Sequence, residues 1–164
     1  MTKLNPRLFA ILIIASYLLS VISIQIAAPD RIIDPGDFPE KCPEDSLNCS
    51  MISPNSHRSG GLVELRFNSD LETVMQEARE WIESQPRTEL IGEWTNQTHS
   101  VFKSLMFRFP DDFLVSGFCE GGQSVIYVFS QSRLGISDIG VNKDRVTSFA
   151  IHMGGVEMPT SECL

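Results

Sequence analysis

The sequence has 164 residues, of which 42% are hydrophobic and 21% are charged, and its formal net charge at pH 7 is -8. This length favours one domain, and the composition is that of a globular chain, which excludes a fibrous or wholly disordered protein. The first 30 residues hold only two of the 13 bases and one of the 21 acids, so the remainder carries 11 bases and 20 acids. Such an acidic chain repels phosphate backbones and has no clustered basic face, which excludes nucleic acid as a partner.

The N-terminal segment is long and apolar enough to cross a membrane. No charged residue occurs between Leu8 and Pro29, and about 20 such residues in a helix match a hydrocarbon core of roughly 30 Å. Two bases, Lys3 and Arg7, precede the segment, and acidic residues follow it. The positive-inside rule then leaves the N-terminus in the cytoplasm and sends the rest of the chain across the membrane. We therefore expect residues 1–30 to form a transmembrane signal anchor, with the domain on the periplasmic or lumenal side.

A cleaved signal peptide is the alternative interpretation of the same segment. A cut after Ala28 would put the bulky Ile26 at the −3 position, where a small residue is required, and Pro29 directly after the cut. Both features disfavour cleavage. The uncleaved anchor is therefore the favoured interpretation, and the membrane is the first expected partner.

Residues 31–61 have the composition of a linker, because they are rich in proline and show little hydrophobic periodicity. We expect this stretch to run extended over the domain, pinned by a cysteine loop. The chain has four cysteines, and an even number in an exported protein favours disulfides. Four cysteines permit three pairings. Proximity favours Cys42 with Cys49, which leaves Cys119 for Cys163.

The cysteines have two alternative interpretations. Some of them could be free buried thiols, because Cys is often buried as a small apolar residue. A zinc site is disfavoured, because the cysteines and histidines lack the tight paired spacings of structural sites. We expect neither a metal nor a cofactor.

Residues 62–153 are expected to form the folded domain, and residues 154–164 a C-terminal tail. A capping pattern from Ser69 to Glu72 precedes an apolar helical face, so we predict a helix that ends at Gln85-Pro86. Alternating or apolar runs separated by turn residues predict the strands. The predicted strands are 62–67, 89–95, 98–109, 113–120 and 124–131, and a last helix covers 142–153.

Consecutive strands with short connections pair antiparallel. The order strand, helix, four strands, helix therefore predicts an α+β fold with a curved antiparallel sheet of four to five strands and two helices on one face. Both alternating sets of strand residues are apolar, as Leu114 and Val115 illustrate. Helices on one side leave the second apolar face to be covered by the linker, by a second copy, or by a lipid, pigment or partner protein.

Polar residues gather between the last strand and the last helix, and at an earlier turn. The candidate ligand-binding residues are Asp111, Asp112, Ser132, Arg133, Ser137, Asp138, Asn142 and Arg145. In a structural interpretation, Asp138 holds a turn, Asn142 caps the last helix and the arginines pair with the turn aspartates. In a ligand-site interpretation, the two arginines bind an anion that Asp138 and the serines orient.

Common catalytic templates are not matched. The adjacent aspartates would point to opposite faces of a strand, which is poor geometry for a shared-proton pair. The three histidines lack metal-ligand spacing, and the chain has no Gly-x-Ser-x-Gly motif. We therefore assign no catalytic residue.

These residues also carry a resemblance to a known family. The stretch from Ser132 to Asn142, followed by Arg145, resembles the signature of the bacterial and plastid family named domain of unknown function 1499. Phe109 to Asp112 is similar to the aspartate turn of that family, and Cys42 to Cys49 to its cysteine loop. The resemblance covers about residues 41–151. It implies that Arg133, Asp138, Asn142 and Arg145 act as a unit with the two aspartates, and it implies no activity.

The chain departs from the family pattern in the cysteine loop and just before the signature. The loop is one residue longer than expected, with Leu47 where a proline is usual. Phe129 stands where an arginine often precedes the signature. A site that uses that arginine is not expected in this chain.

The sequence favours a noncatalytic binding or assembly module, tethered to the membrane. An apolar sheet face beside an arginine–aspartate cluster would suit an amphipathic, lipid-like ligand with an acidic head, or a partner protein. One alternative is a small hydrolase with Asp138 as acid or base and Arg133 stabilising an anion. The other is a purely structural subunit, in which replacing Arg133 lowers stability alone.

Overall fold

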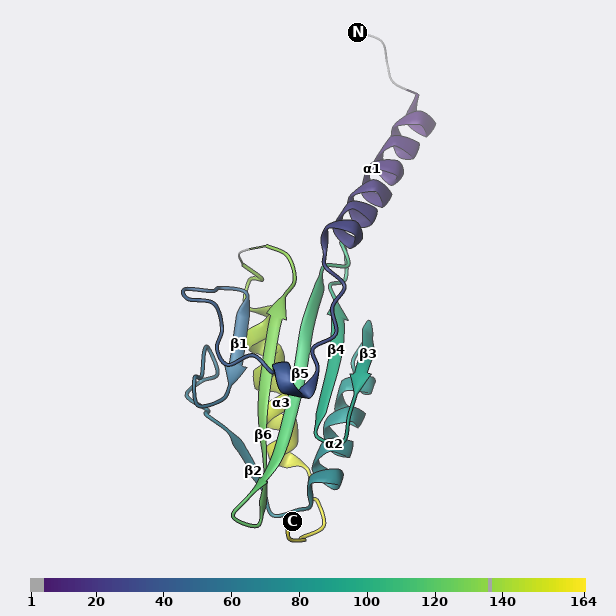
Figure 1. Ribbon diagram of the computed structural model, residues 1–164. Coiled ribbons are helices and arrows are strands. Elements are labelled where there is room, and N and C mark those ends of the chain that lie inside the picture. The colour runs from purple at the N-terminus through teal and green to yellow at the C-terminus, as the bar shows by residue number, and fades with distance from the viewer. Residues whose placement is uncertain (1–4, 136) are drawn as a thin grey trace.

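The computed structural model describes residues 5–135 and 137–164, and it consists of one long N-terminal helix and an α+β domain (Figure 1). The predicted fold class, with an apolar helix ahead of a mixed domain, is confirmed. In chain order the elements are α1 (Pro6–Ala27), the 3-10 helix η1 (Pro35–Asp37), β1 (Cys49–Ile52), β2 (Leu65–Phe67), α2 (Leu71–Ser84), β3 (Thr88–Glu93), β4 (Gln97–Lys103), β5 (Pro110–Glu120), β6 (Gln123–Ser132) and α3 (Val141–Gly155).

Helix α1 is the apolar N-terminal segment, and it extends away from the domain (Figure 1). Its start is fixed by Asn5, whose side-chain oxygen accepts a hydrogen bond from the Arg7 N–H, and by Pro6 in the first turn. Its 22 residues give a length of about 33 Å. By length and composition α1 can cross a membrane, and a signal sequence shares these properties. Lys3, used above for the membrane orientation, lies outside the described residues.

The sheet is antiparallel, with the strand order β1-β6-β5-β4-β3. Strand β2 also pairs with β6, so β1 and β2 share one edge of the sheet. Strand β1 comes from the stretch predicted as a linker, and the sequence pattern did not reveal it. Its four residues, Cys49–Ile52, are all buried and do not alternate in polarity.

The strands meet in turns that fix their register. Gly121 and Gly122 have φ angles of 61° and 80° and join β5 to β6 in a two-residue hairpin, a geometry that glycine adopts without strain. This turn pairs Asp111 with Ser132 across the two strands. The aspartates predicted at a turn therefore lie inside β5, at the end of the sheet where the signature begins.

Strand β4 is shorter than predicted, and this difference exposes apolar residues. The strand ends at Lys103, and residues 104–109 form the turn to β5 instead of continuing the sheet. Leu105, Met106 and Phe107, assigned above to the sheet, are exposed side chains of this turn. We call residues 104–109 the β4–β5 turn.

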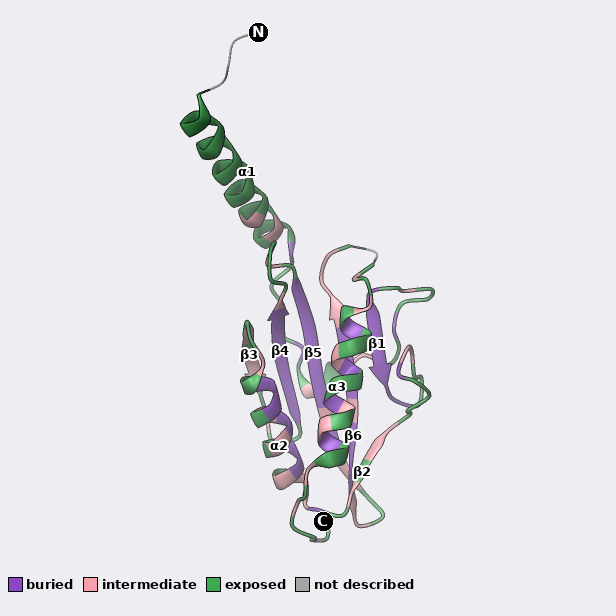
Figure 2. Cartoon of the chain, turned by 180° about the vertical axis from the view of Figure 1, so that it is seen from behind, coloured by how far each residue is buried: buried purple, intermediate pink, exposed green. Residues whose placement is uncertain are grey.

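Helices α2 and α3 cover one face of the sheet, called here the helix face (Figure 2). Asp70, and not Ser69, caps α2 by accepting a hydrogen bond of 2.9 Å from the Thr73 N–H. The centre of this core is aromatic: the Trp81 and Phe149 ring centroids are 5.1 Å apart. The fully or almost fully buried side chains around it are Ile52, Val74, Met75, Ala78, Ile82, Phe102, Phe113, Val115, Ile126, Val128, Val146 and Met153.

The opposite face of the sheet, called here the linker face, is covered by residues 28–42, called here the linker segment. Ile33, Phe38 and Cys42 of this segment pack against Leu114 and Phe129 of the sheet. In Figure 1 the segment with η1 crosses in front of β5. The linker is therefore the cover of the second apolar face. Because this face is closed within the molecule, it is not the binding surface for a lipid or a partner protein that the sequence suggested.

Each face carries one disulfide, and both pairings are those favoured by the sequence. Cys42 bonds to Cys49 and so joins the linker segment to β1. Cys119 bonds to Cys163 and ties the C-terminal tail to the end of β5. All four cysteines are therefore used in structural bonds, so free thiols are excluded as the alternative.

Candidate functional site

The candidate residues divide between the two faces of the sheet. Asp111 and Asp112 are neighbours in β5, and neighbouring side chains of a strand point to opposite sides. Asp112 and Arg133 meet on the linker face, whereas Asp111 pairs with Arg145 of α3 on the helix face. The eight residues therefore form two groups, and their role in ligand binding stays a prediction.

Asp112 is the centre of the group on the linker face. Its side chain is fully buried and accepts hydrogen bonds from His99 at 2.8 Å, from Arg133 at 2.9 Å and from Arg31 at 2.8 Å. Burial acts to raise the pKa of this carboxyl, but the hydrogen bonds from the three donors outweigh it, so the pKa is lowered. We call Arg31, Gln97, His99, Asp112 and Arg133 the junction site.

His99 uses both of its ring nitrogens. The backbone N–H of Ile33 donates to Nδ1 at 3.0 Å, which requires that nitrogen to be an acceptor. The hydrogen is then on Nε2, which donates to Asp112 at 2.8 Å. A fully buried imidazole bound on both sides holds the linker segment and has no nitrogen left to act as a general base.

The junction site takes the place of a neighbouring strand for the linker segment. The Gln97 amide donates to the Ile33 carbonyl at 2.8 Å, so two side chains of β4 bind both backbone groups of Ile33. Arg133, with a side chain only 4% exposed, donates to the carbonyls of Pro29 at 3.0 Å and Arg31 at 3.2 Å. Buried backbone groups require such partners. The junction site therefore fastens the sheet to the chain that leaves α1.

The second group joins α3 to the sheet. Arg145 pairs with Asp111 at 2.9 Å, donates to Ser130 Oγ at 2.9 Å and lies 4.4 Å from the centre of the Phe102 ring. Burial lowers the pKa of the Arg145 guanidinium, while the charge of Asp111 acts to raise it. The guanidinium is held between a carboxylate and an aromatic face, so its role is structural.

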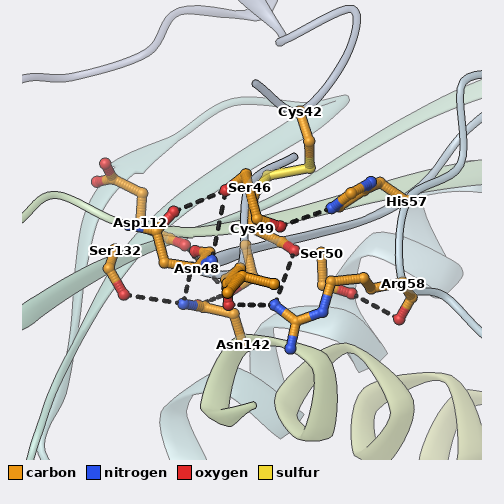
Figure 3. The surroundings of a disulfide bond; sticks show 12 residues. Cys42, Ser46, Asn48, Cys49, Ser50, His57, Arg58, Asp112, Ser132 and Asn142 are labelled. Carbon is orange, nitrogen blue, oxygen red and sulfur yellow. Dashed lines mark hydrogen bonds between the residues drawn. A yellow bond between two sulfur atoms is a disulfide. The ribbon is translucent and has the colours of Figure 1, made fainter. Parts of the chain in front are cut away.

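Asn142 is the second residue of α3 and not its cap, which is Gly140. Its amide donates to the Asn48 carbonyl at 3.1 Å and to Ser132 Oγ at 3.0 Å (Figure 3). Its side-chain oxygen accepts hydrogen bonds from Ser130 and Arg145. Asn142 thus ties α3 to β6 and to the residue directly before β1, beside the Cys42–Cys49 disulfide.

Asp138 has the helix-start function that the sequence suggested for Asn142. Its two carboxylate oxygens accept the backbone N–H groups of Gly140 at 2.9 Å and of Asn142 at 2.6 Å. Arg58 lies 3.8 Å from the same carboxylate and also donates to the Leu47 carbonyl. Residues 47 and 137 form a bridge between the cysteine loop and the signature loop. Ile136 of the signature lies outside the described residues.

A pocket of about 360 Å³ lies between the β4–β5 turn and the signature loop. We call it the signature pocket. Its lining residues are Ser104, Phe109, Asp111, Ser132, Leu134, Gly135, Ser137, Asp138, Ile139 and Val141. Four of the eight candidate residues line this pocket, namely Asp111, Ser132, Ser137 and Asp138. Asn142 and Arg145 bind lining residues directly. A larger pocket of about 450 Å³ lies beside α1 and includes Arg31, Lys103 and Arg133, but also Asp30 and Glu89.

Sequence reasoning missed three members of the junction site: Arg31, Gln97 and His99. Gln97 and His99 are polar residues at fully buried positions of β4, and polar side chains in a buried strand are a sign that they bind something. Arg31 carried no comparable signal, because it lies in a segment without periodicity. Only the folded chain brings Arg31 to Asp112, 81 residues away.

These features define the class of protein: an α+β domain that follows an apolar N-terminal helix and carries two disulfides. The chain belongs to the family described as "Protein of unknown function (DUF1499)", whose model matches residues 40–153. The resemblance seen in the sequence is thereby confirmed.

Comparison with individual proteins adds little to the family assignment. No curated protein matches the chain. Among solved structures the chain is similar to the crystal structure of TTHA0849 from Thermus thermophilus, with a TM-score of 0.34 and 11% identity. That match covers 55% of this chain and 90% of the other chain. A likeness this distant carries no functional argument.

Proposed function

We propose that the protein is a noncatalytic binding module, anchored in a membrane by α1, with its domain on the extracytoplasmic side. The apolar length of α1 supports the anchor. Two disulfides support an oxidising compartment for the domain. Lys3 and Arg7, at the N-terminal end of the apolar segment, and the acidic chain after it support the same orientation.

We propose further that the signature pocket binds an amphipathic ligand, and the lining of the pocket is the observation that carries this proposal. Its volume of about 360 Å³ falls in the usual range for small-molecule pockets, roughly 300–1,000 Å³. Leu134, Ile139 and Val141 provide apolar lining, and Asp111 and Ser132 provide polar groups. Apolar walls with a few polar groups are typical of sites for amphipathic molecules.

The polar groups favour a head group different from the acidic one expected above. An acidic head requires free arginines, but Arg133 is bound to the linker segment and Arg145 to Asp111. The pocket offers oxygens of Asp111, Asp138 and Ser132, which already accept hydrogen bonds within the protein but keep further lone pairs for a ligand. We therefore propose a neutral or cationic head that donates hydrogen bonds.

A hydrolase using Asp138 and Arg133 has less support. Asp138 accepts backbone hydrogen bonds at the start of α3, on the helix side. Arg133 points to the linker face and binds Asp112. Two groups on opposite faces do not converge on one substrate.

Mass spectrometry of the purified full-length chain tests the pocket. We expect an amphipathic molecule from the host membrane to remain bound to the unmodified chain, and Val141→Trp to lose it because the larger ring fills the pocket. Ile151→Trp changes an exposed residue of the same helix outside the pocket and should keep the ligand. A ligand-free unmodified chain, or equal occupancy in both variants, would contradict the proposal.

A further inference from the structure

The β4–β5 turn carries more exposed apolar surface than a soluble loop needs. Four of its six residues are large and apolar, and all four are exposed: Leu105, Met106, Phe107 and Phe109. Loops of soluble domains are usually polar at the tip, and a contiguous apolar patch marks an interaction site. The turn therefore presents a surface that water does not favour.

This turn lies against α1. The Tyr17 hydroxyl donates to the Met106 carbonyl at 2.7 Å, and the Gln25 amide donates to the Arg108 carbonyl at 2.8 Å. The rings of Tyr17 and Phe107 are 6.1 Å apart. Since α1 ends at Ala27, the contact at Tyr17 is ten residues before that end, about 15 Å along the helix axis. The turn thus runs beside the last turns of the apolar helix, as Figure 1 shows at the junction of α1 with β4 and β5.

The backbone of the turn is prepared for an apolar environment. Inside the turn, the Ser104 N–H donates to the Phe109 carbonyl at 3.0 Å, and the Phe109 N–H donates to Ser104 Oγ at 2.9 Å. The two carbonyls at its tip are bound by Tyr17 and Gln25. Irregular backbone enters lipid only when its polar groups have partners in the protein. These contacts also account for Tyr17 and Gln25, two of the polar residues of the mainly apolar α1.

We propose that the β4–β5 turn inserts into the membrane beside α1, as a second contact that fixes the orientation of the domain on the bilayer. This inference rests on the proposed anchoring by α1, because the turn follows the helix into the same layer. The acidic domain has no electrostatic attraction to anionic lipid, so burial of apolar side chains drives insertion.

The signature pocket shares Ser104 and Phe109 with this turn, and its opposite wall carries Ile139, which is 97% exposed. The pocket would then open toward the lipid from which an amphipathic ligand comes.

Tryptophan quenching in vesicles of zwitterionic lipid tests the insertion with the full-length chain. Lipids brominated near the top of the acyl chain quench a tryptophan that lies at that depth. Three single variants are compared with the unmodified chain, which corrects for the two natural tryptophans. Leu105→Trp reports on the turn, Leu18→Trp reports on α1, and Ile151→Trp is the control, because Leu105 and Ile151 are equally exposed at 71%.

We expect the added emission of Leu105→Trp and of Leu18→Trp to be largely lost in brominated vesicles, and that of Ile151→Trp to be retained. Quenching of Leu18→Trp without quenching of Leu105→Trp would overturn the inserted turn and leave the anchor intact. Emission of Leu105→Trp that is blue-shifted but unquenched would mean that a second copy or another protein covers the turn, which also overturns it. Absence of quenching in Leu18→Trp would instead overturn the anchor itself.

Discussion

The two faces of the sheet are closed by different kinds of contact. On the helix face, α2 and α3 bring continuous rows of apolar side chains, and their own backbone groups are already paired within the helices. On the linker face, an irregular segment brings three apolar residues and leaves its backbone groups to be bound by side chains of the sheet. Both faces hold a buried arginine–aspartate pair, but only on the linker face do the polar side chains bind backbone groups, because irregular backbone without a ladder requires polar partners in the interior.

The largest expected effect is on the linker face, at Asp112. Asp112→Ala leaves Arg133 and His99 in the interior without their shared acceptor. Removing one partner of a buried charged group typically costs about 3–5 kcal/mol, so we expect a loss of that size in the free energy of unfolding. Denaturant titration of the full-length chain in detergent micelles measures it. A loss comparable to that of an exposed acidic residue such as Glu83→Ala would show that the junction site contributes little.

The two disulfides allow the faces to be compared directly. Cys119–Cys163 closes a loop with a sequence separation of 44 residues, and Cys42–Cys49 one of 7. Loop-closure entropy then predicts losses of about 4 kcal/mol and about 2 kcal/mol when each pair is replaced by serines. Denaturant titration of the two double variants tests the ranking. If replacing Cys42 and Cys49 lowers the free energy of unfolding more than replacing Cys119 and Cys163, the native contacts of the cysteine loop outweigh the loop-closure entropy of the unfolded chain.

A smaller and local effect is expected at His99. His99→Ala removes the acceptor of the Ile33 N–H, and a buried donor left unpaired costs about 1–3 kcal/mol. Hydrogen exchange should therefore accelerate in the linker segment while the amides of α2 stay protected. Thr98→Ala is the matched control, because Thr98 is buried in the same strand but points to the helix face. Faster exchange throughout the domain, and not only in the linker segment, would show that the two faces unfold together.

The smallest expected effect is the dependence of the linker face on pH. The pKa of Asp112 is lowered in the folded chain, so its stabilising contribution is complete above the unfolded value of about 4 and is lost as the pH falls through the folded value. Asp112→Asn should remove this part of the acid sensitivity. Urea titrations of both chains from neutral pH to acid measure the difference. Parallel curves for the two chains would contradict a charged Asp112 in the interior.

The sequence predicted what depends on local pattern. Apolar length predicted α1, helical spacing predicted α2, and turn residues between apolar runs predicted the separation of β5 from β6. The signature residues were recognised as a group, and the adjacent aspartates were expected to point to opposite faces. The pattern did not reveal which arginine pairs with which aspartate. Strand β1 and the β4–β5 turn were missed or misassigned, because short apolar runs do not tell a strand from a turn.

By itself the sequence determined the apolar helix and the α+β class, because each follows from composition or periodicity. Proximity along the chain favoured the pairing of the cysteines, and the structure decided it. Only the tertiary structure decided which segment of the chain covers each face of the sheet. The linker segment has no periodicity, so its place over Leu114 and Phe129 depends on contacts with residues far away in the chain. Asp112, His99 and Arg31 come together for the same reason: hydrogen bonds between side chains distant in sequence exist only once the sheet has formed and the segment after α1 lies across it.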